Sequence, residues 1–184
     1  MNDLSPRVKE ALKTILQRFE EHEFAPMPIV DLGVMIAQAD GKFDAAEALA
    51  LTSLVGRLLG AEMSVDIVEL LFKASSEVLE LAGFESRARL LGEVLRDCDA
   101  VEPAFVVAVE LALSTERSPD SLRLVKAAKP APRRIRDPER RVLEQLADAA
   151  GLPRSRLEAL LQQAIADAAR ASQAPPAPPE ATEA

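Results

Sequence analysis

Residues 29–39 read IVDLGVMIAQA, and this stretch decides the fold class. Apolar side chains occupy nearly every side of a helix formed by it, which is typical of a helix buried in the middle of a bundle. Asp31 and Gln38 interrupt the stretch, and it is much shorter than the ~20 apolar residues that a membrane-spanning helix needs. It therefore predicts the central helix of a soluble bundle, ending at Asp40-Gly41.

Outward from this stretch, apolar residues recur at helical spacing and strand-like alternation does not occur. Ser5-Pro6 is a typical N-cap and first-turn pair, and a helix is expected from Pro6 to about His22. Inward-facing residues are predicted in later helices from the same spacing. They are Ile67, Val68, Leu71 and Phe72 in a helix at about 64–83, and Leu90, Leu91, Val94 and Leu95 in a helix at about 86–97.

Further helices are expected at about 44–60, from Pro103 through 105–113, briefly from Ser118, at 137–151 and from Pro153. The prediction is an all-α bundle of about eight helices, with an N-terminal helix in residues 1–24 and the main domain in residues 25–170. Residues 171–184 are Pro, Ala and Glu without periodicity, so they are expected to be disordered.

The composition fits a globular helical protein with few catalytic options. Of 184 residues, 48% are hydrophobic and only 3% aromatic, so Leu, Val, Ile and Ala must build the core. The net charge of −8 repels phosphate backbones, and no nucleic-acid partner is expected. A single cysteine and an amino terminus without a signal peptide favour a reducing cytoplasm.

An internal repeat organises the main domain. Ile29–Asp40 aligns without gaps with Phe105–Glu116, and Glu47–Leu58 aligns with Glu139–Ala150. Each pair is a buried helix, an acidic turn and an amphipathic helix, so repeat 1 covers about 28–60 and repeat 2 about 104–152. The second repeat contains a basic, Pro-containing insertion at about 117–136. Two such pairs predict a pseudo-symmetric bundle.

Residues 35–47, MIAQADGKFDAAE, resemble the signature of the TerB family, a hydrophobic helix, an Ala-Asp-Gly turn and a Glu in the next helix. Residues 147–152 resemble the closing segment of that family, and the likeness covers about residues 25–165. The resemblance implies an all-helical bacterial domain for resistance to tellurite and other stress, without known catalysis. It also implies TerC-type membrane-associated partners, and a cytoplasmic location that includes the inner face of the membrane.

The resemblance also implies a metal site in the first acidic turn, made by Asp40, Asp44 and Glu47. These carboxylates suit a divalent cation such as Ca²⁺, Mg²⁺ or Mn²⁺, because such ions take oxygen ligands. A second, degenerate acidic site would contain Glu116 and Glu139, where Glu116-Arg117 replaces the Asp-Gly pair. The alternative is purely structural, since Asp44 and Glu47 also have the spacing of a helix-capping pair.

Basic residues cluster in the insertion and just after it. Such a cluster favours an acidic partner, an anionic membrane surface or nucleic acid, although no aromatic residues are present to stack on bases. The alternative is a solvated loop over the acidic face of the same protein. The residues of this basic loop are Lys126, Lys129, Arg133, Arg134, Arg136, Arg140 and Arg141.

Two residues with reactive side chains are better explained without catalysis. His22, between Glu21 and Glu23, is expected to be an exposed, charge-paired residue at a helix end. Cys98 stands between Asp97 and Asp99, whose charges raise the pKa of a thiol. No nucleophile-elbow, phosphate-binding-loop or zinc-protease motif occurs, so no enzyme is expected and a hydrolase has no residues to support it.

Three hypotheses of function follow from the sequence. The first is a non-enzymatic TerB-like domain that binds a divalent ion or a protein partner through its acidic turn. The second is a structural helical adapter without a metal, for which a homodimer is left open. The third is a binder of nucleic acid or of an anionic membrane surface through the basic loop.

Overall fold

The computed structural model describes residues 5–25, 27–39, 56, 65–114 and 135–173, and they are helical with no strand in these ranges. The prediction of an all-α fold is therefore confirmed. The described helices are α1 (Pro6–Glu21), α2 (Met27–Ala37), α4 (Val65–Ala82), α5 (Phe84–Asp97), α6 (Val101–Ser114), α8 (Asp137–Ala150) and α9 (Arg154–Gln173).

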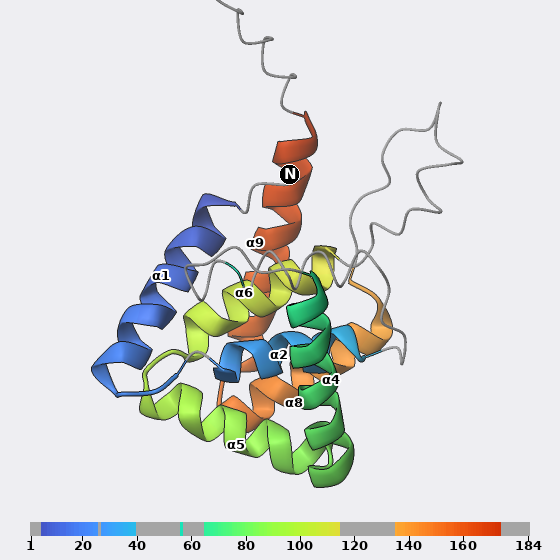
Figure 1. The fold of residues 1–184 in the computed structure, drawn as a ribbon. Helices are drawn as coiled ribbons and strands as arrows, with labels where there is room; N and C mark the ends of the chain where they lie inside the picture. Colours follow the sequence, from blue (N-terminus) through green and yellow to red (C-terminus); the bar gives the residue numbers. More distant parts are fainter. Residues whose placement is uncertain (1–4, 26, 40–55, 57–64, 115–134, 174–184) are drawn as a thin grey trace, which may run out of the picture.

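Helix α1 forms where the sequence predicts it. Ser5 caps its first turn, accepting a hydrogen bond on Oγ from the backbone N of Val8 at 3.3 Å, and Pro6 follows at the first helical position. Apolar residues on one face, among them Ile15 and Phe19, are fully buried. This face packs against α6 (Figure 1).

Helix α2 lies in the middle of the bundle, as the stretch at 29–39 predicts. Every residue from Ile29 to Ala37 is buried, and α2 packs against α4, α5, α6 and α8. Figure 1 shows α2 crossing the centre of the molecule, with α4 standing in front of it. The only acid of α2, Asp31, is thereby enclosed between helices.

Helix α6, which the repeat aligns with α2, is also largely buried. Phe105, Ala112 and Leu113 are fully enclosed, and the helix packs against α1 and α9. Pro103 lies in its first turn, where the missing N–H is tolerated. On the other side of α2, helices α5 and α8 pack closely against each other. One core therefore connects both halves of the predicted repeat.

Other predicted elements lie outside the described residues. They are most of the helix at 44–60, the short helix from Ser118 and the tail from residue 174. Helix α9 continues to Gln173, so its end enters the stretch for which the composition predicts no structure. Among the described helices, none combines the length and the apolar character that crossing a membrane requires.

Candidate functional site

The predicted metal ligands Asp40, Asp44 and Glu47 all lie outside the described residues. The structure describes the chain leading to them as far as Gln38 and Ala39, whose backbone N atoms bond to carbonyl oxygens of α2. Gln38 also donates from Nε2 to Oγ of Ser76 in α4. Gln38, two residues before the predicted ligand Asp40 in the sequence, is therefore bonded to a neighbouring helix. Among the described residues, no group of three or more His, Cys, Asp or Glu could hold a metal.

Glu139, a predicted member of the second acidic site, is a buried residue at the start of α8. Its carboxylate Oε2 accepts a hydrogen bond from the backbone N of Arg136 at 3.0 Å, and Oε1 accepts one from Nε of Arg136 at 3.0 Å. The carboxylate thus satisfies an amide at the helix N-terminus and neutralises the adjacent guanidinium. Glu116, its predicted companion, lies outside the described residues.

The described part of the basic loop is largely paired with acids of the same chain. Arg136 pairs with Glu139, and Arg140 pairs with Glu144 and Glu158. The hydrogen bond that Arg140 donates to Glu144 and the charge of Glu158 raise the pKa of Arg140. Arg141 is exposed. The four other basic residues, Lys126, Lys129, Arg133 and Arg134, lie outside the described residues.

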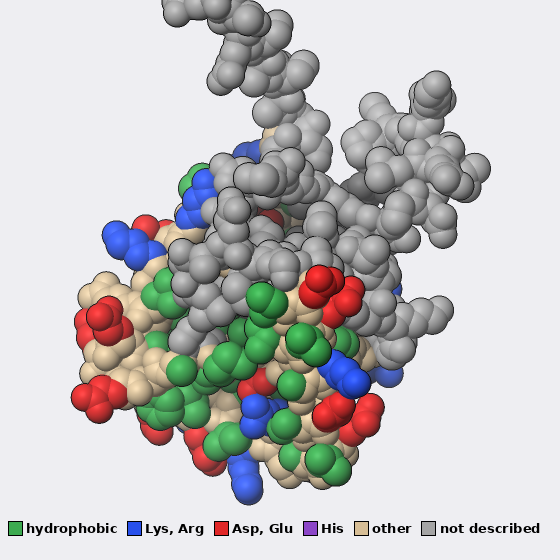
Figure 2. Space-filling model, viewed as in Figure 1, with side chains coloured by type: hydrophobic (Ala, Val, Ile, Leu, Met, Phe, Trp, Pro, Cys, Tyr) green, Lys and Arg blue, Asp and Glu red, His purple; other side chains and the backbone are tan. Residues whose placement is uncertain are grey.

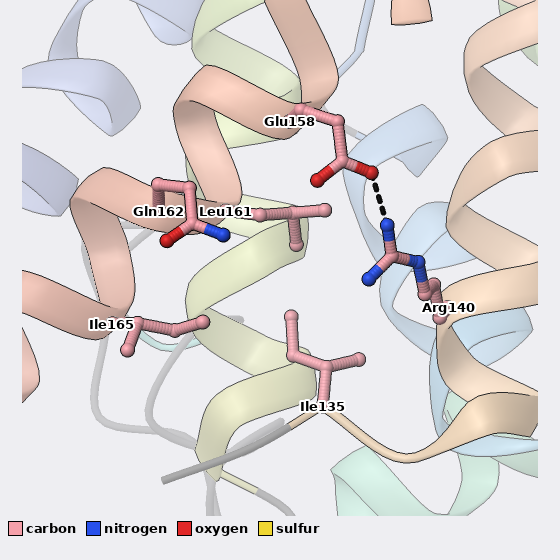
Figure 3. Close-up of a pocket in the computed structure, with 6 residues that line it drawn as sticks. All are labelled: Ile135, Arg140, Glu158, Leu161, Gln162 and Ile165. Atoms are coloured by element: carbon pink, nitrogen blue, oxygen red, sulfur yellow. Dashed lines mark hydrogen bonds and ion pairs between the residues drawn. The ribbon is translucent and has the colours of Figure 1, made fainter. Parts of the chain in front are cut away.

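A small cavity of about 170 Å³ lies beside Arg140, between α8 and α9 (Figure 3). Its walls include the apolar side chains of Ile135, Leu161 and Ile165, and the ion pair of Arg140 with Glu158 borders it. The charged groups at its edge therefore already bond to each other. The volume is below the ~300 Å³ at which ligand pockets usually begin.

Cys98 and His22 occupy the places that the sequence suggests. Cys98 is fully buried, and burial together with the charge of Asp97 raises the pKa of its thiol. The thiol is therefore protonated at neutral pH and is a poor nucleophile. His22 is exposed and ends α1, where its backbone N–H bonds to carbonyl oxygens of the last turn.

A polar seam joins α2 to α4, and sequence reasoning did not find it. Ser75 donates from Oγ to Oδ1 of Asp31 at 3.0 Å, and Arg87 of α5 pairs with Oδ2 of the same carboxylate. The second bond of the seam runs from Gln38 to Ser76, whose Oγ donates in turn to the carbonyl oxygen of Phe72 at 2.7 Å. We call Asp31, Gln38, Ser75 and Ser76 the α2–α4 seam. Asp31, which the sequence shows only as an interruption of an apolar stretch, bonds to both α4 and α5 and holds α4 in place together with the core packing of Leu71, Phe72 and Leu79.

The orientation of α4 exposes apolar side chains to solvent. Ile67 was predicted to face inward, and this prediction is wrong because the residue is 47% exposed. Leu71 and Phe72 do pack against the core. Leu90 of α5, also predicted inward, is 49% exposed. The seam explains the error at Ile67, since it turns the side of α4 that carries Ser75 and Ser76 toward α2.

The exposed apolar residues of α4 lie in one row along the helix. Leu81 is 89% exposed and Leu70 67%, and Ala74 lies between them. In Figure 2 hydrophobic side chains gather on the face of the molecule where α4 stands. We define the α4 row as Ile67, Leu70, Ala74, Val78 and Leu81. Its signal in the sequence is a second apolar face on a helix that needs only one for the core.

Comparison of the chain with family models, with curated proteins and with solved structures found no match, so the likeness to the TerB family rests on the quoted residues alone.

Proposed function

We propose that this chain is a non-enzymatic helical binding domain that docks onto another protein through the α4 row. The observation that supports the proposal is the exposure of Leu70 and Leu81, at 67% and 89%. A continuous row of exposed leucines is unfavourable in water. Burying it against a partner stabilises the complex by about 25 cal/mol for each Å² of apolar surface removed from water. Contiguous apolar patches of this kind mark interaction surfaces.

The seam supports a binding role for α4 because it holds the helix in one orientation. Asp31 accepts a hydrogen bond from Ser75 on one carboxylate oxygen and pairs with Arg87 through the other, so α4 and α5 are both anchored to α2. A partner that docks on the α4 row would therefore meet a preformed surface and would lose less entropy on binding than a mobile one would.

The resemblance to the TerB family suggests the setting of this binding. We place the domain in a cytoplasmic assembly for resistance to tellurite or related stress, with a TerC-type membrane protein among its partners. A divalent ion at Asp40, Asp44 and Glu47 would add charge-dependent regulation, because Gln38, two residues before Asp40 in the sequence, bonds to Ser76 of α4. The support for the ion is the spacing of the three acids in the sequence.

Photo-crosslinking in cells tests whether the α4 row is covered. A photoreactive phenylalanine analogue replaces Leu81 in one variant, and a second variant carries it at Leu90, which is also exposed but lies on α5. We expect irradiation to give a covalent protein adduct from position 81 and much less from position 90. Equal labelling from both positions, or no adduct from position 81, would overturn the proposed function.

A further inference from the structure

The spacing of the α4 row reads the same in both directions. Successive members, from Ile67 to Leu81, are separated by three, four, four and three residues, with Ala74 at the centre. At ~100° per residue, all five side chains lie within about 40° of Ala74 on the helix surface. A row with this symmetry has the same shape after the helix is turned end over end.

We propose that the partner of the α4 row is a second copy of this chain, with the two α4 helices antiparallel and Ala74 of each on the twofold axis. The inference rests on the proposed function, since it names the partner of the same surface. In a twofold interface, if residue i contacts residue j then j contacts i. Leu70 thus faces the partner's Val78, and Ile67 faces the partner's Leu81.

The sizes of the side chains fit this arrangement. Ala74, the smallest member, lies where the two helices cross, which allows the axes to approach to about 8 Å. Larger side chains flank it on both sides, so they can interdigitate with those of the partner. The most exposed residue, Leu81, packs beside the partner's Ile67 at each end of the contact.

The charges beside the row favour the antiparallel direction. Lys73 is the one base of α4, and Glu77 lies one turn further on along the same edge. In the proposed register Lys73 lies about 3 Å along the axis from the partner's Glu77, on the same edge of the contact. Symmetry makes two such pairs. The two Lys73 residues are equally close along the axis, but Glu77 lies nearer to the line of Ala74, at about 60° against about 100° for Lys73. A parallel pairing would place this edge against the opposite edge of the partner's α4, which carries Leu71 and Ser75, and both pairs would be lost.

Sedimentation of the purified full chain tests the association directly. Interference optics are needed because the chain has no Trp or Tyr. One helix from each copy gives an interface at the small end of the usual range, so we expect dimers with a Kd of about 100 µM or below. Leu81→Glu should weaken the dimer at least tenfold, as judged by about 1.4 kcal/mol per tenfold change. The matched control, Leu90→Glu, should leave it unchanged.

Charge exchange tests the antiparallel register with variants that keep the apolar row. Lys73→Glu should weaken the dimer, because each Glu77 then faces an acid of the partner. Adding Glu77→Lys to that variant should restore the dimer, since both intermolecular pairs reappear with reversed signs. Circular dichroism verifies that each variant is folded. Failure of the double variant to recover would overturn the register.

Disulfide trapping locates the twofold axis. Cys98 is buried, so Ala74→Cys introduces an accessible thiol at the proposed axis. Mild oxidation should convert this variant to a covalent dimer much faster than Glu93→Cys, an exposed control on α5. Equal rates would overturn the placement of the axis.

The outcomes separate this inference from the proposed function. A wild-type chain that stays monomeric up to about 500 µM, well above the Kd expected for even a small interface, would overturn the inference. The proposed function would survive if the photo-crosslink from position 81 then had the mass of a different protein. It would fail with the inference if position 81 gave no adduct or was labelled no more than position 90.

Discussion

Gly92 of α5 lies directly against the backbone of Ala149 in α8. A Cβ atom at position 92 would be 2.5 Å from the carbonyl oxygen of Ala149 and 2.9 Å from the backbone N of Ala150. Arg96 donates from Nη1 to the same carbonyl oxygen at 2.6 Å. The two helices therefore approach each other as closely as a residue without a side chain allows.

Gly92→Ala should destabilise the protein although alanine is the better helix former. The new methyl group meets rigid backbone, and overpacking typically costs about 1–3 kcal/mol. Helix propensity offsets about 1 kcal/mol of this cost. We expect a net loss of about 1–2 kcal/mol in urea unfolding followed by circular dichroism. Glu93→Ala, at the neighbouring exposed position, should change stability by less than about 0.5 kcal/mol. Equal effects of the two would disprove the close approach.

Asp31→Ala should release α4 from the bundle. It leaves Arg87 and Ser75 without their carboxylate partner, and breaking a buried pair costs about 3–5 kcal/mol. Arg87 is one-quarter exposed, so about 2–3 kcal/mol is expected here. Hydrogen exchange should accelerate first in α4. The control is Arg89→Ala, which removes an exposed ion pair between Arg89 and Glu93, both on α5. Uniform acceleration in all helices would argue against a local role for the seam.

The pair of Glu102 with Arg156 should stabilise the fold only above acidic pH. The hydrogen bond from Arg156 lowers the pKa of Glu102 below its ordinary value. A carboxyl group with a lower pKa in the folded state contributes stability above its unfolded pKa, about 4.3. That contribution is lost as pH falls through the folded pKa. Because both side chains are about half exposed, it should stay below about 1 kcal/mol.

Urea unfolding of the wild type and of Arg156→Ala at several pH values measures this contribution. The difference between them should be largest near pH 7 and should shrink as Glu102 protonates in acid. In a Glu102→Gln background, Arg156→Ala should lose this dependence on pH. A difference that persists unchanged in strong acid would assign the stabilisation to packing of the arginine instead.

Titration calorimetry with Ca²⁺, Mg²⁺ and Mn²⁺ tests the acidic turn. If Asp40 and Glu47 hold an ion, saturable binding should appear and should be absent from the double variant Asp40→Asn/Glu47→Gln. Glu139→Gln should leave such binding intact, because that carboxylate is already engaged by Arg136. No heat up to about millimolar, the weak end for oxygen-ligand sites, would reduce the acids to helix caps.

Helical periodicity predicts the described fold well because most helices have a single apolar face. Residues 29–39 identify the central helix, and the pair Ser5-Pro6 marks the start of α1 to the residue. Pattern alone cannot orient α4, since apolar residues lie on two of its faces. The choice is made by Ser75 and Asp31, 44 positions apart in the sequence. No local rule connects such a pair.

The candidate site was harder to predict because it also depends on how segments that are far apart in the sequence pack together. The sequence points to acids in a turn and to a basic loop, and most of these residues lie outside the described part of the chain. Of those described, Glu139 and Arg136 bond to each other. Their spacing of three residues also fits a helix cap. Exposure of Leu81 depends on how α4 docks, so it becomes visible only in three dimensions.

The α2–α4 seam also restricts how α4 can change in length. Ala74 of the exposed α4 row and Ser75 of the seam are neighbours in the chain. The residues that bond to α2 and the residues of the α4 row are therefore held at a fixed angle to each other around the helix. Inserting a single residue between Ala74 and Ser75 would rotate the rest of the helix by about 100°. Val78 and Leu81 would then leave the line set by Ile67 and Leu70, and Ser75 would also leave Asp31 if the first half of α4 kept its place. Related chains should therefore tolerate substitutions along α4 far better than insertions or deletions within it.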